Sequence, residues 1–299
     1  PSLLKLDDVN WGPKPFRVLD CWQSSPQYSD FVLNQWKGIS VVGTASFVLK
    51  EKLKAMKNLL KTWNKESFGE LSVKISDMRE KVNMLDIKCE EDGLTAEEVN
   101  CRKEWTAALC HLLSLQHSLL FQKSRLKWIQ EGDANSKHFE HHFMALPGRR
   151  PTLNGAYFKS LSQEEASNLI IPFSEEEVKV VVWDCGGSKS PSPDGFNFKF
   201  IQDFWDVLKT DFISFLYEFH SSGKLVKGSN SSFIVLIPKV DCPQKVEEYR
   251  PISLIGVMYK VLAKVLANRL RKVIGTVISE CQSAFIKERL IFDSIMIAN

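Results

Sequence analysis

Two cationic side chains, Lys239 and Arg250, each lie beside a short apolar run near the C-terminal end of the sequence. Phe233–Ile237 is rich in β-branched residues and is closed by Pro238, a pattern typical of a buried strand. Pro251–Ile255 predicts a strand or turn that returns alongside the first run. Such a hairpin would bring Lys239 and Arg250 to the same end of the sheet, where they could bind a phosphate group, the arginine bidentately.

The predicted hairpin is followed by a predicted helix, Met258–Val273. Three leucines at every fourth position, Leu262, Leu266 and Leu270, predict its buried face. The basic residues of this helix are expected mostly elsewhere on its surface: Lys260, Lys264, Arg269, Arg271 and Lys272. Basic residues of this kind are usually just solvated, so by themselves they identify no function.

A second helical region covers residues 45–88. Apolar residues follow a 4-3-4-3 spacing on both sides of a break at Ser67–Gly69: Leu49, Leu53, Met56, Leu60 and Trp63 before it, and Leu71, Ile75, Met78, Val82 and Leu85 after it. Gly93 ends this region, and Thr95 with Glu98 predicts a capping box that starts another helix, which extends to about Ile129. Two long helices joined by a short turn predict an antiparallel helical hairpin.

The first of these helices carries an excess of lysine. Lys50, Lys52, Lys54, Lys57, Lys61 and Lys65 are opposed only by Glu51 and Glu66. One interpretation is a plain structural linker with solvated lysines. The other is a basic helical arm that contacts RNA or DNA. The candidates for such contacts are Lys50, Lys54, Lys57 and Lys61.

The segment Phe198–Phe219 predicts a further helix, with Asp194 as its cap and Gly195 in the preceding turn. Its apolar residues form a wide, largely aromatic stripe: Ile201, Trp205, Leu208, Phe212, Phe215 and Phe219. Such a stripe could stack nucleobases. At helical spacing it more often packs in a hydrophobic core, and we expect the core.

Histidine and cysteine do not predict a metal site. Helical spacing could place His138, His141 and His142 on one face, but no further ligand with a familiar spacing completes the set. The seven cysteines are scattered without a C-x-x-C pair. We therefore expect no metal, reduced thiols, and an intracellular location in nucleus or cytoplasm. No apolar run is long enough to span a membrane, and a net charge of +3 does not by itself indicate nucleic-acid binding.

Several short strings occur in an order that resembles one protein family. They are IPKV (Ile237–Val240), YRPISLIG (Tyr249–Gly256), YK-x-LAK-x-LA-x-RL (Tyr259–Leu270) and QSAFI (Gln282–Ile286). In this order they resemble the fingers of reverse transcriptases from LINE-type (non-LTR) retrotransposons, of the kind abundant in plant genomes. Upstream, KSPSPDGFNFKFIQDFW (Lys189–Trp205) is similar to the family's KSPGPDGF segment, SRLKWIQEGDANSKHFEHHF (Ser124–Phe143) to its W-x-x-x-GD-x-NSKFFH signature, and VNWGPKPFRVLDCWQSSPQYSDFVLNQW (Val9–Trp36) to the tail after its apurinic-type endonuclease domain.

The resemblance implies an α+β fold, in which a long helical connector precedes an incomplete fingers subdomain of the right-hand polymerase type. Residues 1–45 would be the end of the endonuclease domain, and we expect them to be irregular because they contain several prolines and glycines. Residues 46–145 would be the connector, an antiparallel helical hairpin. Residues 146–299 would be the N-terminal part of the reverse transcriptase domain.

The resemblance also implies roles for individual residues. Lys239 and Arg250 would contact the triphosphate of an incoming nucleotide. Gln282, Phe285 and Arg289 match a following family motif near the template path, so they are candidate template-binding residues. The implied partners are an RNA template and target DNA, and no membrane.

The sequence also departs from the family pattern. Polymerases of this kind join nucleotides with two metal ions held by carboxylates. The family supplies these from a palm motif that begins with Asp and from a later aromatic-Ala-Asp-Asp motif, and neither occurs before Asn299. Asp293 falls in a helix-like stretch and is interpreted as a surface residue, while Ser192 and Glu288 replace usual glycines. We therefore expect a catalytically incomplete chain without a cofactor of its own, whereas the intact enzyme would use Mg²⁺.

Two other interpretations stay open. One is a non-catalytic nucleic-acid-binding or helical interaction module built on the helical hairpin. The other is an unstable relic of a mobile element with no function. Fingers without a palm would expose apolar surface and an unpaired strand edge, so self-association through that surface or through the helical hairpin is also expected.

Overall fold

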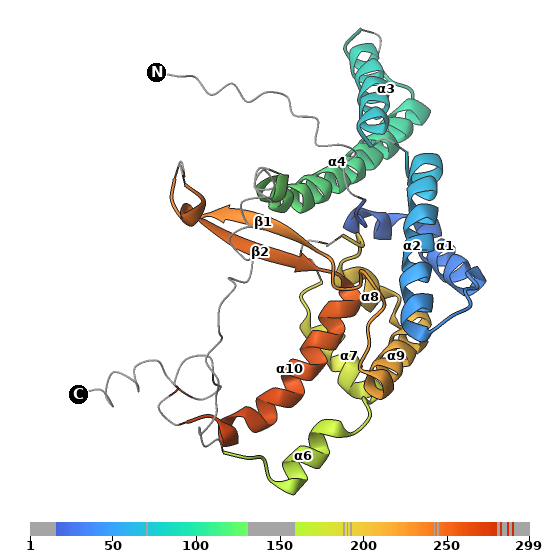
Figure 1. Cartoon of the computed structure of the whole chain (residues 1–299). Coiled ribbons are helices and arrows are strands. Elements are labelled where there is room, and N and C mark those ends of the chain that lie inside the picture. The colour runs from blue at the N-terminus through green and yellow to red at the C-terminus, as the bar shows by residue number, and fades with distance from the viewer. Residues whose placement is uncertain are drawn as a thin grey trace.

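The computed structural model describes residues 16–130 and 159–279, apart from residues 70, 92, 188, 190, 192, 242 and 244, together with residues 282, 286 and 289. Most of this part of the chain is helical, and two strands form a small antiparallel sheet (Figure 1), so the α+β class is confirmed. No helix within these ranges combines the length and the apolarity needed to cross a bilayer. The histidine group near residue 140, Phe285 and the predicted helix-like stretch around Asp293 lie outside the described residues.

The N-terminal region contains a helix that the sequence analysis did not predict. A short 3-10 turn, Asp20–Ser24, leads into α1, Pro26–Gly38. Pro26 occupies the first helical position, where its missing N–H has no intrahelical partner to lose, so it starts the helix instead of breaking it. Tyr28, Val32 and Trp36 are then buried at four-residue spacing. The expectation of an irregular region is therefore wrong for its described part.

Helix α2, Ala45–Trp63, buries the apolar residues predicted for it, from Leu49 to Trp63. It packs against α9, Trp205–Ser222, which supplies two carboxylates to the contact. Glu218 accepts hydrogen bonds of 2.8 Å from both the backbone N–H and the hydroxyl of Ser46, in the first turn of α2. Asp211 binds the Lys52 ammonium at 2.9 Å and also the indole N–H of Trp36 at 2.9 Å. One helix thereby fixes both α1 and α2.

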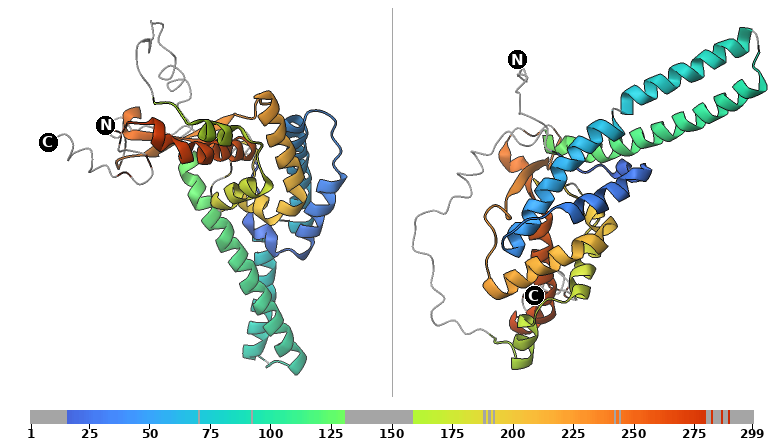
Figure 2. Two further views of the ribbon diagram at one scale, coloured as in Figure 1. Left: turned by 90° about the horizontal axis from the view of Figure 1, so that it is seen from below. Right: turned by 90° about the vertical axis from the view of Figure 1, so that its right-hand side faces the viewer.

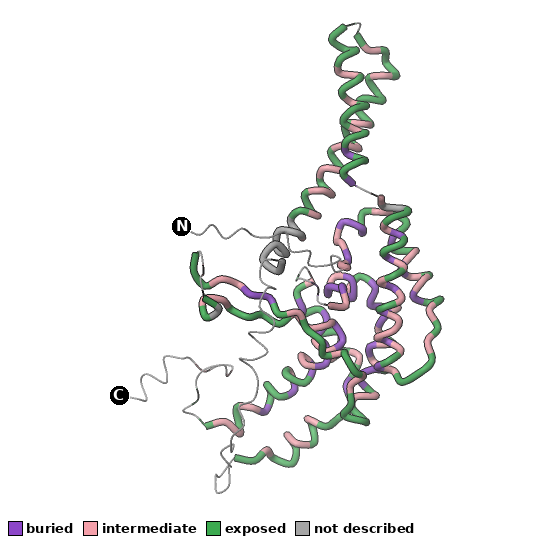
Figure 3. Tube along the Cα trace, turned by 45° about the horizontal axis from the view of Figure 1, so that its top comes forward, coloured by how far each residue is buried: buried purple, intermediate pink, exposed green. Residues whose placement is uncertain are grey.

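The predicted helical hairpin is confirmed. Helix α2 ends in a π-helical turn, Asn64–Phe68, and α3, Leu71–Glu91, and α4, Ala96–Gln130, then form an antiparallel arm that projects from the body (Figure 2). Most described residues of the arm are exposed or half-buried, as Figure 3 shows. The end of the arm returns to the body, where the Gln122 amide donates to the Val18 carbonyl at 3.0 Å and accepts from the Asp20 N–H at 3.3 Å.

The predicted helix over residues 198–219 is two helices. Helix α8, Phe198–Asp203, ends at Phe204, whose φ of −113° and ψ of 22° break the helical path before α9 begins. The aromatic stripe is buried as expected, which confirms the core interpretation. The predicted cap is wrong, because Asn197 accepts the hydrogen bond from the Phe200 N–H at 3.0 Å while Asp194 binds elsewhere.

The C-terminal half consists of α6, Gln163–Ile170, and α7, Glu175–Asp184, followed after α8 and α9 by a β-hairpin and a long helix. Strand β1, Ser232–Pro238, pairs with β2, Tyr249–Ile255, in antiparallel register from Ser232 opposite Ile255 to Pro238 opposite Tyr249. Helix α10, Val257–Val277, begins directly after β2 and packs on α6 and α7. The hairpin therefore continues into α10 without a flexible loop.

The buried face of α10 differs from the predicted leucine stripe. Leu262 is buried, but Leu266 and Leu270 are 40% and 50% exposed. The buried row also has a spacing of four, but it starts one position earlier than the leucines, and one position turns the helix by about 100°. The residues that face the body are Val257, Val261, Val265, Arg269 and Val273, with Met258 and Leu262 buried beside the first turns of this row.

The main hydrophobic cluster runs from Val18 to Val265. It joins α1, α2, α7, α8, α9 and the first half of α10, with Leu115 and Leu119 of α4 packed at its side. The division into domains at residues 45/46 and 145/146 stays a prediction. The hydrophobic cluster contains residues from all three of these parts of the chain.

The tip of the arm yields a prediction about pH. The Glu98 carboxylate binds the Lys88 ammonium and accepts from the Thr95 N–H at 2.9 Å, and these hydrogen bonds lower the pKa of Glu98 to about 2. A depressed folded-state pKa stabilises the arm above the unfolded value of about 4.5 and loses this effect as the pH falls through about 2. A carboxyl NMR titration should give a Glu98 pKa near 2, raised in the variant Lys88→Ala. A value near 4.5 in the unsubstituted chain would contradict this geometry.

Candidate nucleic-acid interface

The β-hairpin places its two predicted cations together. Ile237 lies opposite Arg250 in the register, and the Lys239 N–H donates to the Glu248 carbonyl at 2.6 Å, which extends the ladder by one residue. Side chains alternate between the two faces of a strand, so Lys239 shares a face with Ile237 and hence with Arg250. The expectation that both cations lie at the same end of the sheet is confirmed.

Both cations are exposed. The Lys239 ammonium donates to the Glu247 carbonyl at 2.7 Å, a bond that leaves two of its three donors for another ligand. Arg250 has no hydrogen-bond or ion-pair partner among the described residues, and its guanidinium carries five N–H donors. An arginine in this state can bind two oxygens of one phosphate group.

The four candidate lysines of α2 form a second basic surface. Their positions i, i+4, i+7 and i+11 follow one face of the helix, and we call them the lysine stripe: Lys50, Lys54, Lys57 and Lys61. Part of its charge is bound within the protein, since the Lys50 ammonium donates to the Lys227 carbonyl, Lys54 pairs with Glu51, and Lys57 donates to the Pro193 carbonyl at 3.3 Å.

The lysine stripe carries enough charge to affect its own members. Partial burial and the neighbouring Lys61 charge lower the pKa of Lys57, and Asp194 acts in the opposite direction. The ammonium groups of Lys57 and Lys61 lie 5.8 and 5.9 Å from the ring centre of Phe16, within the range of a cation–π contact. Like charges held side by side in this way favour an anionic ligand.

The lysine stripe lies at the root of the hairpin. Lys227 belongs to the loop that leads into β1, and Pro193 belongs to the loop that contacts the start of α10. Lys239 and Arg250 lie at the other end of the two strands. At about 3.4 Å per residue, the six steps of β1 place these cations roughly 20 Å from the start of the strand.

The remaining candidates are placed elsewhere. The Arg289 guanidinium donates to the carbonyls of Ser279 at 2.6 Å and of Gln282 at 2.8 Å, and it also reaches those of Gly275 and Ile278. It therefore binds the free carbonyls at the C-terminal end of α10, a common contact for a basic residue. The hairpin joins the opposite end of this 21-residue helix, about 31 Å away along its axis. A role for Gln282, Phe285 and Arg289 in template binding stays a prediction.

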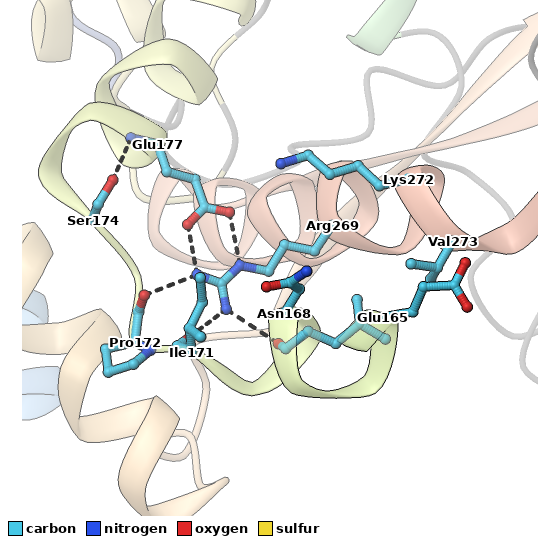
Figure 4. A pocket seen from close by; sticks show the side chains of 10 residues that line it. Glu165, Asn168, Ile171, Pro172, Ser174, Glu177, Arg269, Lys272 and Val273 are labelled. Carbon is cyan, nitrogen blue, oxygen red and sulfur yellow. Dashed lines mark hydrogen bonds and ion pairs between the residues drawn. The ribbon is translucent and has the colours of Figure 1, made fainter. Parts of the chain in front are cut away.

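Arg269, expected mostly on the outer surface of its helix, is only 6% exposed. All five of its N–H groups are used (Figure 4). Nε and Nη2 bind the two oxygens of Glu177 at 2.8 and 2.7 Å, and the other bonds go to the carbonyls of Leu169, Ile171 and Pro172. Its position between Val265 and Val273, at four-residue spacing in an apolar row, is the sequence signal that could have indicated its burial.

A cavity of about 480 Å³ surrounds Arg269, between α6, α7 and α10. Its main polar groups bind one another: Arg269 and Glu177 form an ion pair, and Glu165 closes the capping box of α6 with Ser162. The ring of Phe173 lies 4.3 Å from the guanidinium carbon. We therefore interpret the cavity as the surroundings of a clamp that holds residues 169–172 on α10.

No metal centre is apparent in the part of the chain that the structure describes. No group of three or more His, Cys, Asp or Glu side chains there could hold a metal ion. Two carboxylates near α2 already have protein partners: Asp194 binds the Val257 N–H and Asp211 binds Lys52. The Mg²⁺ that the sequence resemblance implies for an intact enzyme finds no fitting ligand set among these residues.

Replacing Arg269 by Met tests the clamp. The substitution leaves the Glu177 carboxylate and three carbonyls without their donor. Since the remaining Glu177 side chain is 24% exposed, a loss of about 1–3 kcal/mol of unfolding free energy is expected. The matched control is Lys272→Met, one turn away on the exposed face, where about 0.5 kcal/mol or less is expected. Urea denaturation measures both values. Equal losses in the two variants would contradict a structural role for Arg269.

Comparison with known proteins finds a similarity to a transposon protein. No protein-family model matches the chain. It is 31% identical over 137 residues to a Xenopus laevis protein described as "Transposon TX1 uncharacterized 149 kDa protein". The match covers 46% of this chain, which spans about a tenth of that protein's length. The similarity supports the origin of this chain in a transposable element.

Proposed function

We propose that this chain is a segment of the RNA-directed DNA polymerase (reverse transcriptase) of a LINE-type, non-LTR retrotransposon. Its β-hairpin and the helices around it would form the fingers, preceded by the helical connector and the end of an endonuclease domain. The order of the family-like strings and the similarity to a transposon protein support this proposal. The plant-like character rests on the strings alone.

The observation that carries the proposal is the end of the β-hairpin. Two exposed cations share one face there, and one of them is an arginine without a partner among the described residues. A planar fork of N–H donors matches the oxygens of a phosphate group. The function we assign to this end is the binding of a phosphate, from the triphosphate of an incoming nucleotide or from the backbone of an RNA template.

Catalysis is a separate question. Joining nucleotides requires metal ions held by carboxylates, and the family takes these from motifs that the 299-residue sequence does not include. These 299 residues by themselves should bind nucleic acid without extending a primer. Mg²⁺ and target DNA belong to the proposed activity of the intact enzyme.

The connector favours a second candidate function. The lysine stripe lies on one face of α2, and the arm beyond it is largely exposed. This combination fits a non-catalytic module that binds nucleic acid through α2 or another helix through the arm. In that case the hairpin cations would contribute little to binding.

A salt series of fluorescence-anisotropy titrations separates the two functions. Arg250→Ala should weaken binding of a nucleoside triphosphate and of single-stranded RNA by about 1.5–3 kcal/mol, as expected for a lost charge-assisted hydrogen bond. Replacing the whole lysine stripe by Ala should weaken only RNA binding and should reduce its salt dependence. Arg79→Ala, an exposed arginine on α3, is the charge-matched control and should change neither.

Two outcomes would count against the proposal. If Arg250→Ala leaves both ligands unaffected while the lysine substitutions abolish RNA binding, the module is the better assignment. If no variant changes any affinity, the chain has no specific nucleic-acid surface, as expected of a relic.

Primer extension tests the catalytic part. With an RNA template, a DNA primer, deoxynucleotides and Mg²⁺, the 299-residue chain should give no product above a control without protein. Extension in this assay would show that the chain holds a complete metal site, and the proposed division between binding and catalysis would then be wrong.

A further inference from the structure

Asp194 joins the start of α10 to the loop before α8. One carboxylate oxygen accepts the Val257 N–H at 2.7 Å, in the first turn of α10, and the other accepts the Phe196 N–H at 3.2 Å. Asp194 therefore acts as an N-cap for a helix 63 residues away in the sequence. A carboxylate at this end also interacts favourably with the helix dipole.

The neighbouring glycines allow this contact to form. A Cβ on Gly256 would lie 3.0 Å from the Asp194 carboxylate oxygen, so a side chain there would displace it. Gly195 has φ of +86°, and a Cβ on it would lie 2.6 Å from the Phe16 carbonyl oxygen. Both glycines let backbone segments approach more closely than other residues permit.

The same loop is attached to α2 and to the N-terminal segment. Lys57 of the lysine stripe donates to the Pro193 carbonyl at 3.3 Å, and the Val18 N–H donates to the Gly195 carbonyl at 2.9 Å. Since β2 runs directly into α10, the position of the hairpin relative to α2 depends on this loop. The Asp194–Val257 hydrogen bond joins this loop to the first turn of α10.

We propose that Asp194 is a positioning residue, which holds the hairpin in place relative to the lysine stripe. In this position one single strand of nucleic acid can contact the hairpin cations and the lysine stripe together. This inference rests on the proposed function and adds the length of the ligand to it. The length of β1, roughly 20 Å, lies between its start, which is the end nearer the lysine stripe, and the cations at its other end. At about 3.4 Å per stacked nucleotide, a strand of four nucleotides is too short to reach both, and one of sixteen is long enough.

The test uses the 299-residue chain and labelled oligouridylates of four and sixteen nucleotides. Asp194→Ala should weaken binding of the longer RNA about fivefold, which corresponds to ~1 kcal/mol, and leave the shorter RNA unchanged. Gly256→Ala should have the same effect by displacing the carboxylate. Asp194→Asn keeps an oxygen acceptor and should restore most of the affinity.

Ser174→Ala is the matched control, because it removes the N-cap bond to the Glu177 N–H of α7, at 3.1 Å, without touching the hairpin. It should leave both RNA lengths unaffected at matched folded fractions. Equal weakening of both lengths by Asp194→Ala would mean that the residue acts only on folding, and no weakening would mean that it does not position the hairpin. Either result overturns this inference and leaves the proposed function standing. If Arg250→Ala does not weaken binding of the longer RNA, both the inference and the proposed function are wrong.

Discussion

The hydrogen bond from the Val257 N–H to the Asp194 carboxylate is the constraint on which the C-terminal half depends. The β-hairpin has only two strands, which are marginal in water without further packing. It is stabilised because β2 continues into α10 and because α4 packs on β1. Asp194 fixes the first turn of α10, and this bond acts together with the apolar packing of that half of α10 on the core built by α1, α2 and α9.

The other end of α10 is fixed by a different kind of contact. Arg269 satisfies three carbonyls and a carboxylate at once, in a place where a buried charge without partners would be costly. Its contacts lie at the end of α6, on the residues that follow it and on Glu177 of α7. Hydrogen bonds thus hold this end of α10 on α6 and α7, whereas apolar packing holds α2 on α9.

The sequence predicted those elements whose signal is local. Examples are the capping box at Thr95 and Glu98 and the 4-3-4-3 rows of α2 and α3. A helix cap involves residues three positions apart, and a helix face repeats every three or four residues, so both can be recognised from neighbouring residues alone. The partners of Asp194 and Arg269 could not be predicted in this way. They lie 63 and about 100 residues away, and no periodicity encodes a contact at that distance.

The arm formed by α3 and α4 leaves the body at Gly69 and returns to it at Gln122, so both of its ends are anchored while its tip contacts nothing else among the described residues. The contacts with the body therefore depend on the difference in length between α3 and α4, and not on their combined length. Whole turns added to or removed from both helices together would preserve the Gln122 contacts. Such an arm is free to change its reach during evolution, whereas the loop around Asp194 cannot gain a residue without moving the hairpin.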